Sequence, residues 1–183
     1  MNRKKRKSNV GTMVLKEVLI FCIYIAVFFG IMLLVRNFAL QRTLVNGISM
    51  ENTLHDGDIL LLDKISYKRG DPQRFDIIAF EQSSSVYYIK RIIGLPGEKV
   101  RIDDKGNIYI NGQLLEESYG NEVIKGSMDE ITVGQSQYFV LGDNRNNSKD
   151  SRDPSVQCIA KDKILGRAFI RVWPIGSIGK ITQ

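Results

Sequence analysis

"NIYINGQLL", residues Asn107 to Leu115, joins two short apolar runs through an Asn-Gly pair. Asn and Gly both accept positive φ angles, so Asn-Gly is the strongest short-range signal for a two-residue hairpin turn. Runs of the same kind, separated by Gly-, Pro- and Asn-rich turns, occupy residues 58–63, 76–80, 86–93, 99–102, 137–142 and 164–173. We therefore expect residues 36–183 to form a mainly β domain with antiparallel strands. The stretch 116–135 has the weakest apolar pattern and is expected to be a surface excursion.

The first 35 residues have a different character. "MNRKKRK" carries five basic residues and no acid, and residues Val18 to Val35 contain no charge. As a helix this run would be about 27 Å long, close to the thickness of a bilayer's hydrocarbon core. A cleaved signal peptide begins in the same way, but its apolar region is shorter, and "RNFALQRTL" is a poor cleavage site. The sequence therefore predicts a retained transmembrane helix at 18–35 after a basic segment at 1–17.

The charge distribution predicts the orientation of this anchor. Residues 1–35 hold six basic residues and one acid, whereas the rest of the chain holds 20 and 19. By the positive-inside rule the N-terminus stays cytoplasmic and residues 36–183 form an extracytoplasmic domain of a single-pass cell-membrane protein. A nucleic-acid partner is not expected, because the β domain has a net charge of only +1. Cys22 and Cys158 fall in different parts, so no disulfide is expected between them.

"NGISMENTLHDGD", residues 46–58, places Ser49 six positions before the chain's single histidine, His55. Serine needs a base within hydrogen-bond reach to act as a nucleophile. His55 would need a tight chain reversal to serve, and "HDGD" has the composition of a turn. Lys90 is the second candidate, because it interrupts the apolar run "VYYIKRII", where burial would lower its pKa and free the neutral amine. Arg91 cannot be a base because it stays charged.

Four motifs occur in order after the apolar run: "SMENTL" (49–54), "KRGDPQRFDIIAF" (68–80), "YIKRIIGLPGE" (88–98) and "GDNRNNSKDSR" (142–152). With the N-terminal anchor, this series resembles the bacterial type I signal peptidases (leader peptidases) of the serine–lysine type, in a Gram-positive-like form. The resemblance implies a transmembrane helix followed by an antiparallel β catalytic domain. It also implies a serine endopeptidase in which Ser49 is the nucleophile, Lys90 is the general base and Ser148 orients the lysine amine. No metal or other cofactor is implied.

The resemblance also assigns residues around this centre. In the family the last motif holds the active-site loop in shape, here through Asp143, Arg145, Asp150 and Arg152. From adjacency and family together, the substrate pockets are expected to be lined by Ile48, Met50, Tyr88 and Ile89. The substrates would be exported preproteins whose signal peptides end in small residues, with membrane lipid and the secretion machinery as neighbours. Two positions depart from the family: Gly47 lacks a hydroxyl that completes the oxyanion hole in some members, and Asn52 replaces a proline.

Three other functions compete with this interpretation. A serine–lysine protease of the self-cleaving repressor kind is cytosolic, which the apolar run argues against. A membrane-tethered β domain without catalysis would tolerate Gly47 and Asn52, but it would not need Ser49 and Lys90. A serine–histidine hydrolase would use His55 instead.

Overall fold

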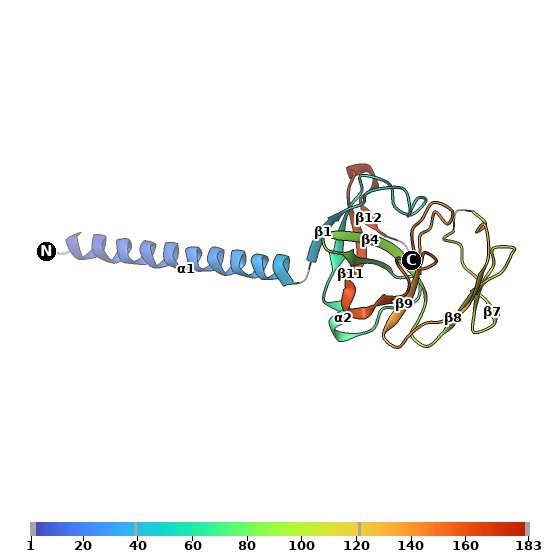
Figure 1. Cartoon of the computed structure of the whole chain (residues 1–183). Helices are drawn as coiled ribbons and strands as arrows, with labels where there is room; N and C mark the ends of the chain where they lie inside the picture. The colour runs from blue at the N-terminus through green and yellow to red at the C-terminus, as the bar shows by residue number, and fades with distance from the viewer. Residues whose placement is uncertain (1–2, 39, 121, 182–183) are drawn as a thin grey trace. The chain divides into compact units, whose positions relative to one another are not determined.

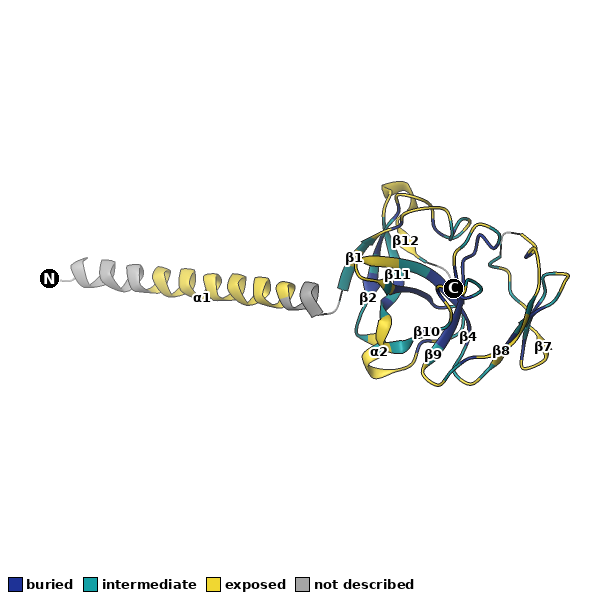
Figure 2. Ribbon diagram, viewed as in Figure 1, coloured by how far each residue is buried: buried dark blue, intermediate teal, exposed yellow. Residues whose placement is uncertain are grey.

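The computed structural model describes residues 3–38, 40–120 and 122–181, and within the N-terminal helix it describes side chains only between Met13 and Leu33. The chain divides into two units, residues 1–39 and 40–183. The first unit contains helix α1 (Arg3–Phe38), drawn in blue in Figure 1. Its segment Met13–Leu33 is long and apolar enough to cross a membrane, and its residues are exposed (Figure 2). This helix fits a membrane-anchored protein; the basic residues 3–7 and the end of the expected span, residues 34 and 35, lie outside the described side chains.

Residues 40–183 form two antiparallel sheets, which confirms the mainly β prediction. Within the described residues the larger sheet has eight strands in the order β1-β2-β11-β3-β4-β9-β10, with β12 paired to β11. The strands are β1 (Leu40–Leu44), β2 (Ile59–Asp63), β3 (Ile77–Ser83), β4 (Val86–Gly94), β9 (Gln137–Leu141), β10 (Ile159–Ala160), β11 (Ile164–Trp173) and β12 (Gly179–Lys180). Short helices α2 (Ser66–Arg69), η1 (Lys161–Lys163) and η2 (Ile175–Ser177) connect them.

The smaller sheet contains the hairpin from which the sequence analysis began. Its order is β7-β6-β5-β8, with β5 (Lys99–Ile102), β6 (Ile108–Ile110), β7 (Gln113–Leu114) and β8 (Met128–Thr132). Asn111 and Gly112 join β6 to β7 with φ angles of 51° and 80°. Two successive positive φ angles are the signature of the type I′ turn that Asn-Gly favours. The hairpin prediction is therefore confirmed.

The expectation that residues 116–135 form only a surface excursion is wrong. This stretch contains β8, which pairs with β5, and its residues Ile124 and Val133 are buried in the core of the smaller sheet. Asp129 and Glu130 occupy exposed positions of β8. Only Met128 and Ile131 are apolar in this strand, so its sequence shows a weak apolar pattern. The residues of β8 do not alternate strictly in exposure, and its register with β5 is irregular, so the period-two signal of a strand is weak.

Strand β4 lies between β3 and β9 near the middle of the larger sheet, and its residues pass from exposed to buried along its length (Figure 2). Its second half is buried from Lys90 to Gly94, and the register pairs Lys90 with Ile78 and Arg91 with Ile77. A lysine and an arginine thus lie side by side within the most buried part of the sheet. Burying a charge is costly unless it is paired or neutralised, so this pair marks the position at which the site is built.

Candidate active site

Ser49 and Lys90 meet although 41 residues separate them in the sequence. Ser49 lies in the turn that connects β1 to β2, and Lys90 projects from the buried half of β4. The Lys90 Nζ lies 2.7 Å from the Ser49 Oγ, and it donates a second hydrogen bond of 2.9 Å to the carbonyl oxygen of Ile89. The two atoms are at the distance that direct proton transfer requires.

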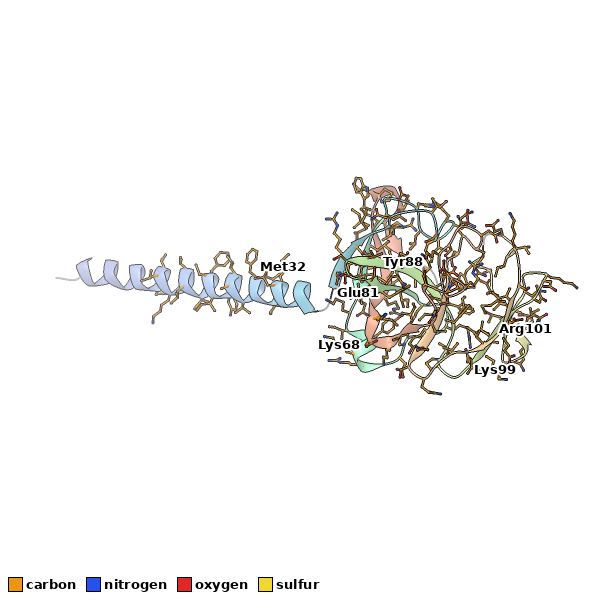
Figure 3. The ribbon with its side chains drawn as sticks, viewed as in Figure 1. Met32, Lys68, Glu81, Tyr88, Lys99 and Arg101 are labelled. Atoms are coloured by element: carbon orange, nitrogen blue, oxygen red, sulfur yellow. The ribbon has the colours of Figure 1, made fainter. Side chains whose placement is uncertain are left out.

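The surroundings of Lys90 favour its neutral form. The residue is only 4% exposed, and the ring of Tyr88, labelled in Figure 3, lies 5.3 Å from Nζ. Burial lowers the pKa of the Lys90 amine from 10.5 to about 8, because desolvation penalises the ammonium form. The carboxylates of Asp150 and Asp143 oppose this shift without cancelling it. At pH 7 about a tenth of the amine is then neutral and able to accept a proton.

Arg91, the next residue on β4, forms a buried ion pair. Its Nε and Nη2 donate to the two oxygens of Asp143 at 2.9 and 2.7 Å, and neither side chain is exposed. The Thr53 hydroxyl donates to the same carboxylate at 2.5 Å, and Nη1 of Arg91 donates to the Phe75 carbonyl at 2.9 Å. The ring of Tyr119 lies 3.8 Å from the guanidinium carbon. This network ties together β4, the loop after β9 and the turn that carries Ser49.

The sequence motifs indicated no structural role for Arg91, Thr53 or Tyr119. The available signal was the arginine itself, because a charge inside an apolar strand needs a buried partner. Asp143 was already singled out, 52 positions away. A buried arginine predicts that such a partner exists, but the sequence does not say which carboxylate it is.

The loop at residues 142–152 is held by its own charged side chains. Asp150 accepts hydrogen bonds from the Gly142 backbone N–H at 3.0 Å and from Arg152 Nε at 2.8 Å. Arg145 Nε donates to the Gly142 carbonyl at 3.1 Å, while its Nη1 lies 2.7 Å from Glu117. Asp150 and Arg145 are 1% and 2% exposed, so they are buried parts of the loop rather than solvated charges.

The same loop contacts the Ser49 segment directly. The backbone N–H of Asn144 donates to the Ser49 carbonyl at 3.1 Å, and the Asn144 side-chain amide donates to the Ile48 carbonyl at the same distance. A Cβ added to Gly142 would overlap both the Ser49 carbonyl oxygen and the Ser148 hydroxyl. Gly142 is therefore required for this close approach, and Asn144 fixes the backbone on both sides of the Ser49 nitrogen.

Two residues considered in the sequence lie differently in the structure. The Ser148 hydroxyl is buried next to Gly142 and has no hydrogen-bond partner among the described residues, so the bond to Lys90 implied by the resemblance is not formed here. His55 is exposed, and its Nδ1 lies 2.6 Å from a carboxylate oxygen of Glu51. It makes no recorded contact with Ser49.

A groove of about 520 Å³ opens over Ser49 and Lys90. It is lined by Arg42, Thr43, Leu44, Val45, Asn46, Ser49, Met50, Ser85, Tyr87, Tyr88, Ile89, Lys90 and Lys149. Three of the four residues expected in the substrate pockets lie here, but Ile48 does not: its side chain is exposed outside the lining. The contribution of β1 was not predicted, because "LQRTL" reads as a strand only once its pairing with β2 is known.

The departures from the family pattern have local structural consequences. Asn52 has a φ of 77°, in the left-handed region that asparagine tolerates and that proline cannot adopt. Gly47 also has a positive φ, 91°, and its N–H donates to Asp56 at 2.7 Å. The turn around Ser49 is thus built on Gly47 and Asn52.

Comparison with known proteins identifies the family of this chain. The family model described as signal peptidase, peptidase S26, matches residues 15–173. A probable signal peptidase I-2 from Synechocystis sp. is 40% identical over 156 residues, which are 81% of this chain and 70% of that protein. Signal peptidase IB of Staphylococcus aureus is 33% identical over 177 residues, 87% of this chain and 91% of that protein. A crystal structure of a signal peptidase I from Enterococcus faecalis V583 is 37% identical, covers 54% of this chain and 97% of its own, and has a TM-score of 0.46. The chain therefore belongs to the signal peptidase family, peptidase S26, and is a serine peptidase of that family.

Proposed function

We propose that this protein removes N-terminal signal peptides from exported preproteins, with Ser49 as nucleophile and Lys90 as general base. The observation that carries the proposal is the 2.7 Å separation of Ser49 Oγ from a lysine amine whose pKa burial lowers to about 8. Family membership supports the substrate class, since the related proteins are named signal peptidases. The geometry supports the two catalytic roles.

The proposed reaction passes through an acyl-enzyme. The neutral Lys90 amine takes the Ser49 proton as Oγ attacks the scissile carbonyl carbon. The resulting ammonium then gives that proton to the leaving amine, which restores the neutral base. Lys90 next takes a proton from a water molecule that attacks the ester, and Ser49 leaves as a hydroxyl. Lys90 donates each proton that it accepts, so these steps balance without a metal or another cofactor.

The tetrahedral intermediate needs hydrogen-bond donors for its oxyanion. The Ser49 backbone N–H is one candidate, because no hydrogen bond from it is recorded within the described part of the chain. The two contacts of Asn144, to the Ile48 and Ser49 carbonyls, flank this peptide unit and hold its N–H in a fixed direction. Gly47 offers no side-chain donor.

Ser148 is proposed as the residue that orients Lys90 during turnover. Its hydroxyl is buried beside Gly142 without a partner, and a buried hydroxyl that lacks a hydrogen bond is costly. A rotation of the Lys90 amine away from the Ile89 carbonyl would give Ser148 a partner when Ser49 is acylated. The loop ion pairs of Asp150 and Arg152 then hold Ser148 in place.

The preprotein is proposed to bind as an extended strand in the groove between β1 and β4. An added strand points alternate side chains in one direction, which explains a requirement for small residues at positions −1 and −3. Tyr88, Ile89 and Met50 would line the pockets for these residues. The basic N-terminus is proposed to stay in the cytoplasm, so that α1 holds the β domain outside, where cleavage sites emerge.

The test uses the detergent-solubilised full chain and a purified preprotein. We expect Ser49→Ala and Lys90→Ala to abolish cleavage, and His55→Ala to retain at least half of it, because His55 is exposed and paired with Glu51. Cleavage that survives Lys90→Ala contradicts the role of the lysine. A wild type inactive on preproteins with small residues at −1 and −3 contradicts the proposed substrate class and favours a binding module.

A further inference from the structure

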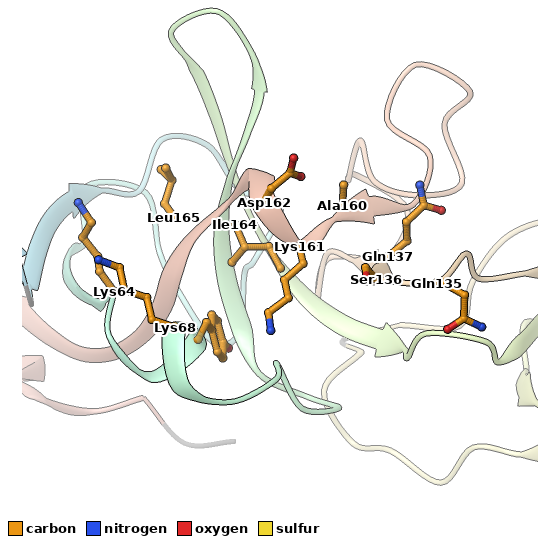
Figure 4. Close-up of a pocket in the computed structure, with 11 residues that line it drawn as sticks. Lys64, Lys68, Gln135, Ser136, Gln137, Ala160, Lys161, Asp162, Ile164 and Leu165 are labelled. Carbon is orange, nitrogen blue, oxygen red and sulfur yellow. The ribbon is translucent and has the colours of Figure 1, made fainter.

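A second groove, of about 750 Å³, is larger than the groove over Ser49 and Lys90, and Figure 4 draws the residues that line it. Its wall combines the apolar surfaces of Tyr67, Ile164 and Leu165 with three lysines, Lys64, Lys68 and Lys161. None of these residues lines the groove above the catalytic pair. The proposed peptidase reaction therefore leaves this groove without a role.

The charges around the groove are unbalanced. Lys161 is held by Asp71 at 2.6 Å, whereas no ion pair of Lys64 or Lys68 is recorded among the described residues. Asp162 is the one carboxylate in the lining as described, and Figure 4 shows it pointing away from the Lys161 amine. Two lysines without acidic partners beside an apolar wall suit a ligand with an anionic head and an apolar tail.

The connectivity of the chain indicates where such a ligand would come from. Leu40 is the second residue after Phe38, the last residue of α1, and β1 pairs Leu40 with Asp63. Lys64 follows Asp63 directly, and Lys68 lies in the helix that comes next, α2. If α1 spans a membrane, only residue 39 separates its last residue from Leu40, whose strand partner Asp63 directly precedes Lys64. A lysine near an anionic membrane surface contributes favourable binding energy.

We propose that this groove binds the phosphate headgroup of an anionic membrane lipid through Lys64 and Lys68, with the first part of an acyl chain against Tyr67, Ile164 and Leu165. The amine groups bind the phosphate, and the apolar wall distinguishes a lipid from inorganic phosphate. The inference rests on the membrane insertion of α1 and is independent of the catalytic roles of Ser49 and Lys90.

The experiment is native mass spectrometry of the detergent-solubilised full chain at subsaturating lipid. The probes are phosphatidylglycerol, phosphatidylcholine with the same acyl chains, and inorganic phosphate. The test variant is Lys64→Gln/Lys68→Gln. The matched control is Lys105→Gln/Lys125→Gln, which removes two exposed lysines that do not line the groove. Thermal unfolding of each variant in the same detergent verifies that it is folded.

We expect phosphatidylglycerol adducts on the wild type and the control, and a loss of about twenty-five-fold in the test variant, from about fivefold for each lysine. Phosphatidylcholine should bind weakly and equally to all three proteins. Undiminished phosphatidylglycerol binding in the test variant overturns the site. Equal binding of the two lipids to the wild type, or displacement of phosphatidylglycerol by an equal concentration of inorganic phosphate, overturns the anionic lipid as its ligand.

Discussion

Lys90 and Arg91 are buried neighbours on β4, but only the charge of Arg91 is balanced by an ion pair. Arg91 receives a matched carboxylate, Asp143, and stays a permanent cation in a fixed position. The Lys90 amine contacts only the Ser49 hydroxyl and the Ile89 carbonyl among its recorded hydrogen-bond partners, and desolvation lowers its pKa to about 8. Since successive side chains of a strand point to opposite faces, one strand can serve both needs. Burial with a partner makes a structural cation, and burial without one makes a base.

Replacing Lys90 is expected to produce the largest change in activity. Lys90→Met keeps the length and removes the base, so we expect cleavage of a preprotein to fall by about 10²–10⁴-fold. The substitution should also stabilise the fold at neutral pH by up to about 3 kcal/mol, because it removes a desolvated amine.

The pH dependence of this stabilisation follows from the direction of the pKa shift. Between about pH 8 and 10.5 the unfolded chain binds the proton that folded Lys90 has lost, so wild-type stability rises with pH in this window. Below pH 8 the cost of the buried ammonium is fully present. Urea denaturation of both proteins should therefore show the largest gain for Lys90→Met at pH 7 and little gain above pH 10.5. A variant less stable than wild type at pH 7 would mean that the Lys90 amine is a net stabilising group.

Breaking the ion pair between Arg91 and Asp143 should lower the stability of the fold, whereas Lys90→Met should raise it. Asp143→Ala leaves Arg91 buried and unpaired, and we expect it to reduce the free energy of unfolding by about 3–5 kcal/mol. Asp71→Ala is the matched control, because it breaks an exposed pair with Lys161 and should cost less than about 1 kcal/mol. Equal losses of unfolding free energy in the two variants would show that the buried pair contributes no more to stability than the exposed pair.

A smaller effect is expected where the loop after β9 meets Ser49. Gly142→Ala introduces a Cβ that overlaps the Ser49 carbonyl and the Ser148 hydroxyl. The loop must shift, at a cost of about 1–3 kcal/mol, and preprotein cleavage should slow because Ser49 moves relative to Lys90. Gly176→Ala is the control, since a Cβ there meets no atom within 4 Å. Wild-type cleavage by Gly142→Ala would argue that the loop does not position Ser49.

The smallest expected effect concerns the turn after Ser49. Asn52→Pro restores the residue that the family resemblance leads one to expect, but its fixed φ near −65° conflicts with the observed 77°. We expect it to lower the free energy of unfolding by about 1 kcal/mol or more. Asn52→Gly should change that free energy by only about a few tenths of a kcal/mol relative to wild type. Thermal unfolding of both variants measures the difference. A stabilised Asn52→Pro would show that the turn rearranges to accept proline.

The sequence predicted local features better than long-range ones. The Asn111-Gly112 hairpin and the main strands follow from patterns a few residues long. β8 and β1 could not be assigned in this way, because their pairing partners rather than their own side chains make them strands.

In the candidate site, too, local motifs were easier to predict than contacts between distant segments. The motifs pointed to Ser49 and Lys90, and the structure brings them to 2.7 Å. The contacts of Arg91 and Asn144 with distant segments depend on how β4, the Ser49 turn and the loop after β9 pack, and no local pattern encodes them. The exposure of Ile48 likewise depends on how the turn is oriented.

The central claim is that Lys90 titrates as a lowered-pKa amine in the folded protein. NMR of the detergent-solubilised chain labelled with 13C at lysine Cε tests this directly, with the Lys90 signal assigned by its absence from Lys90→Met. The account predicts one lysine signal with a titration midpoint of about 8. A Lys90 midpoint at or above the ordinary value of 10.5 would contradict it.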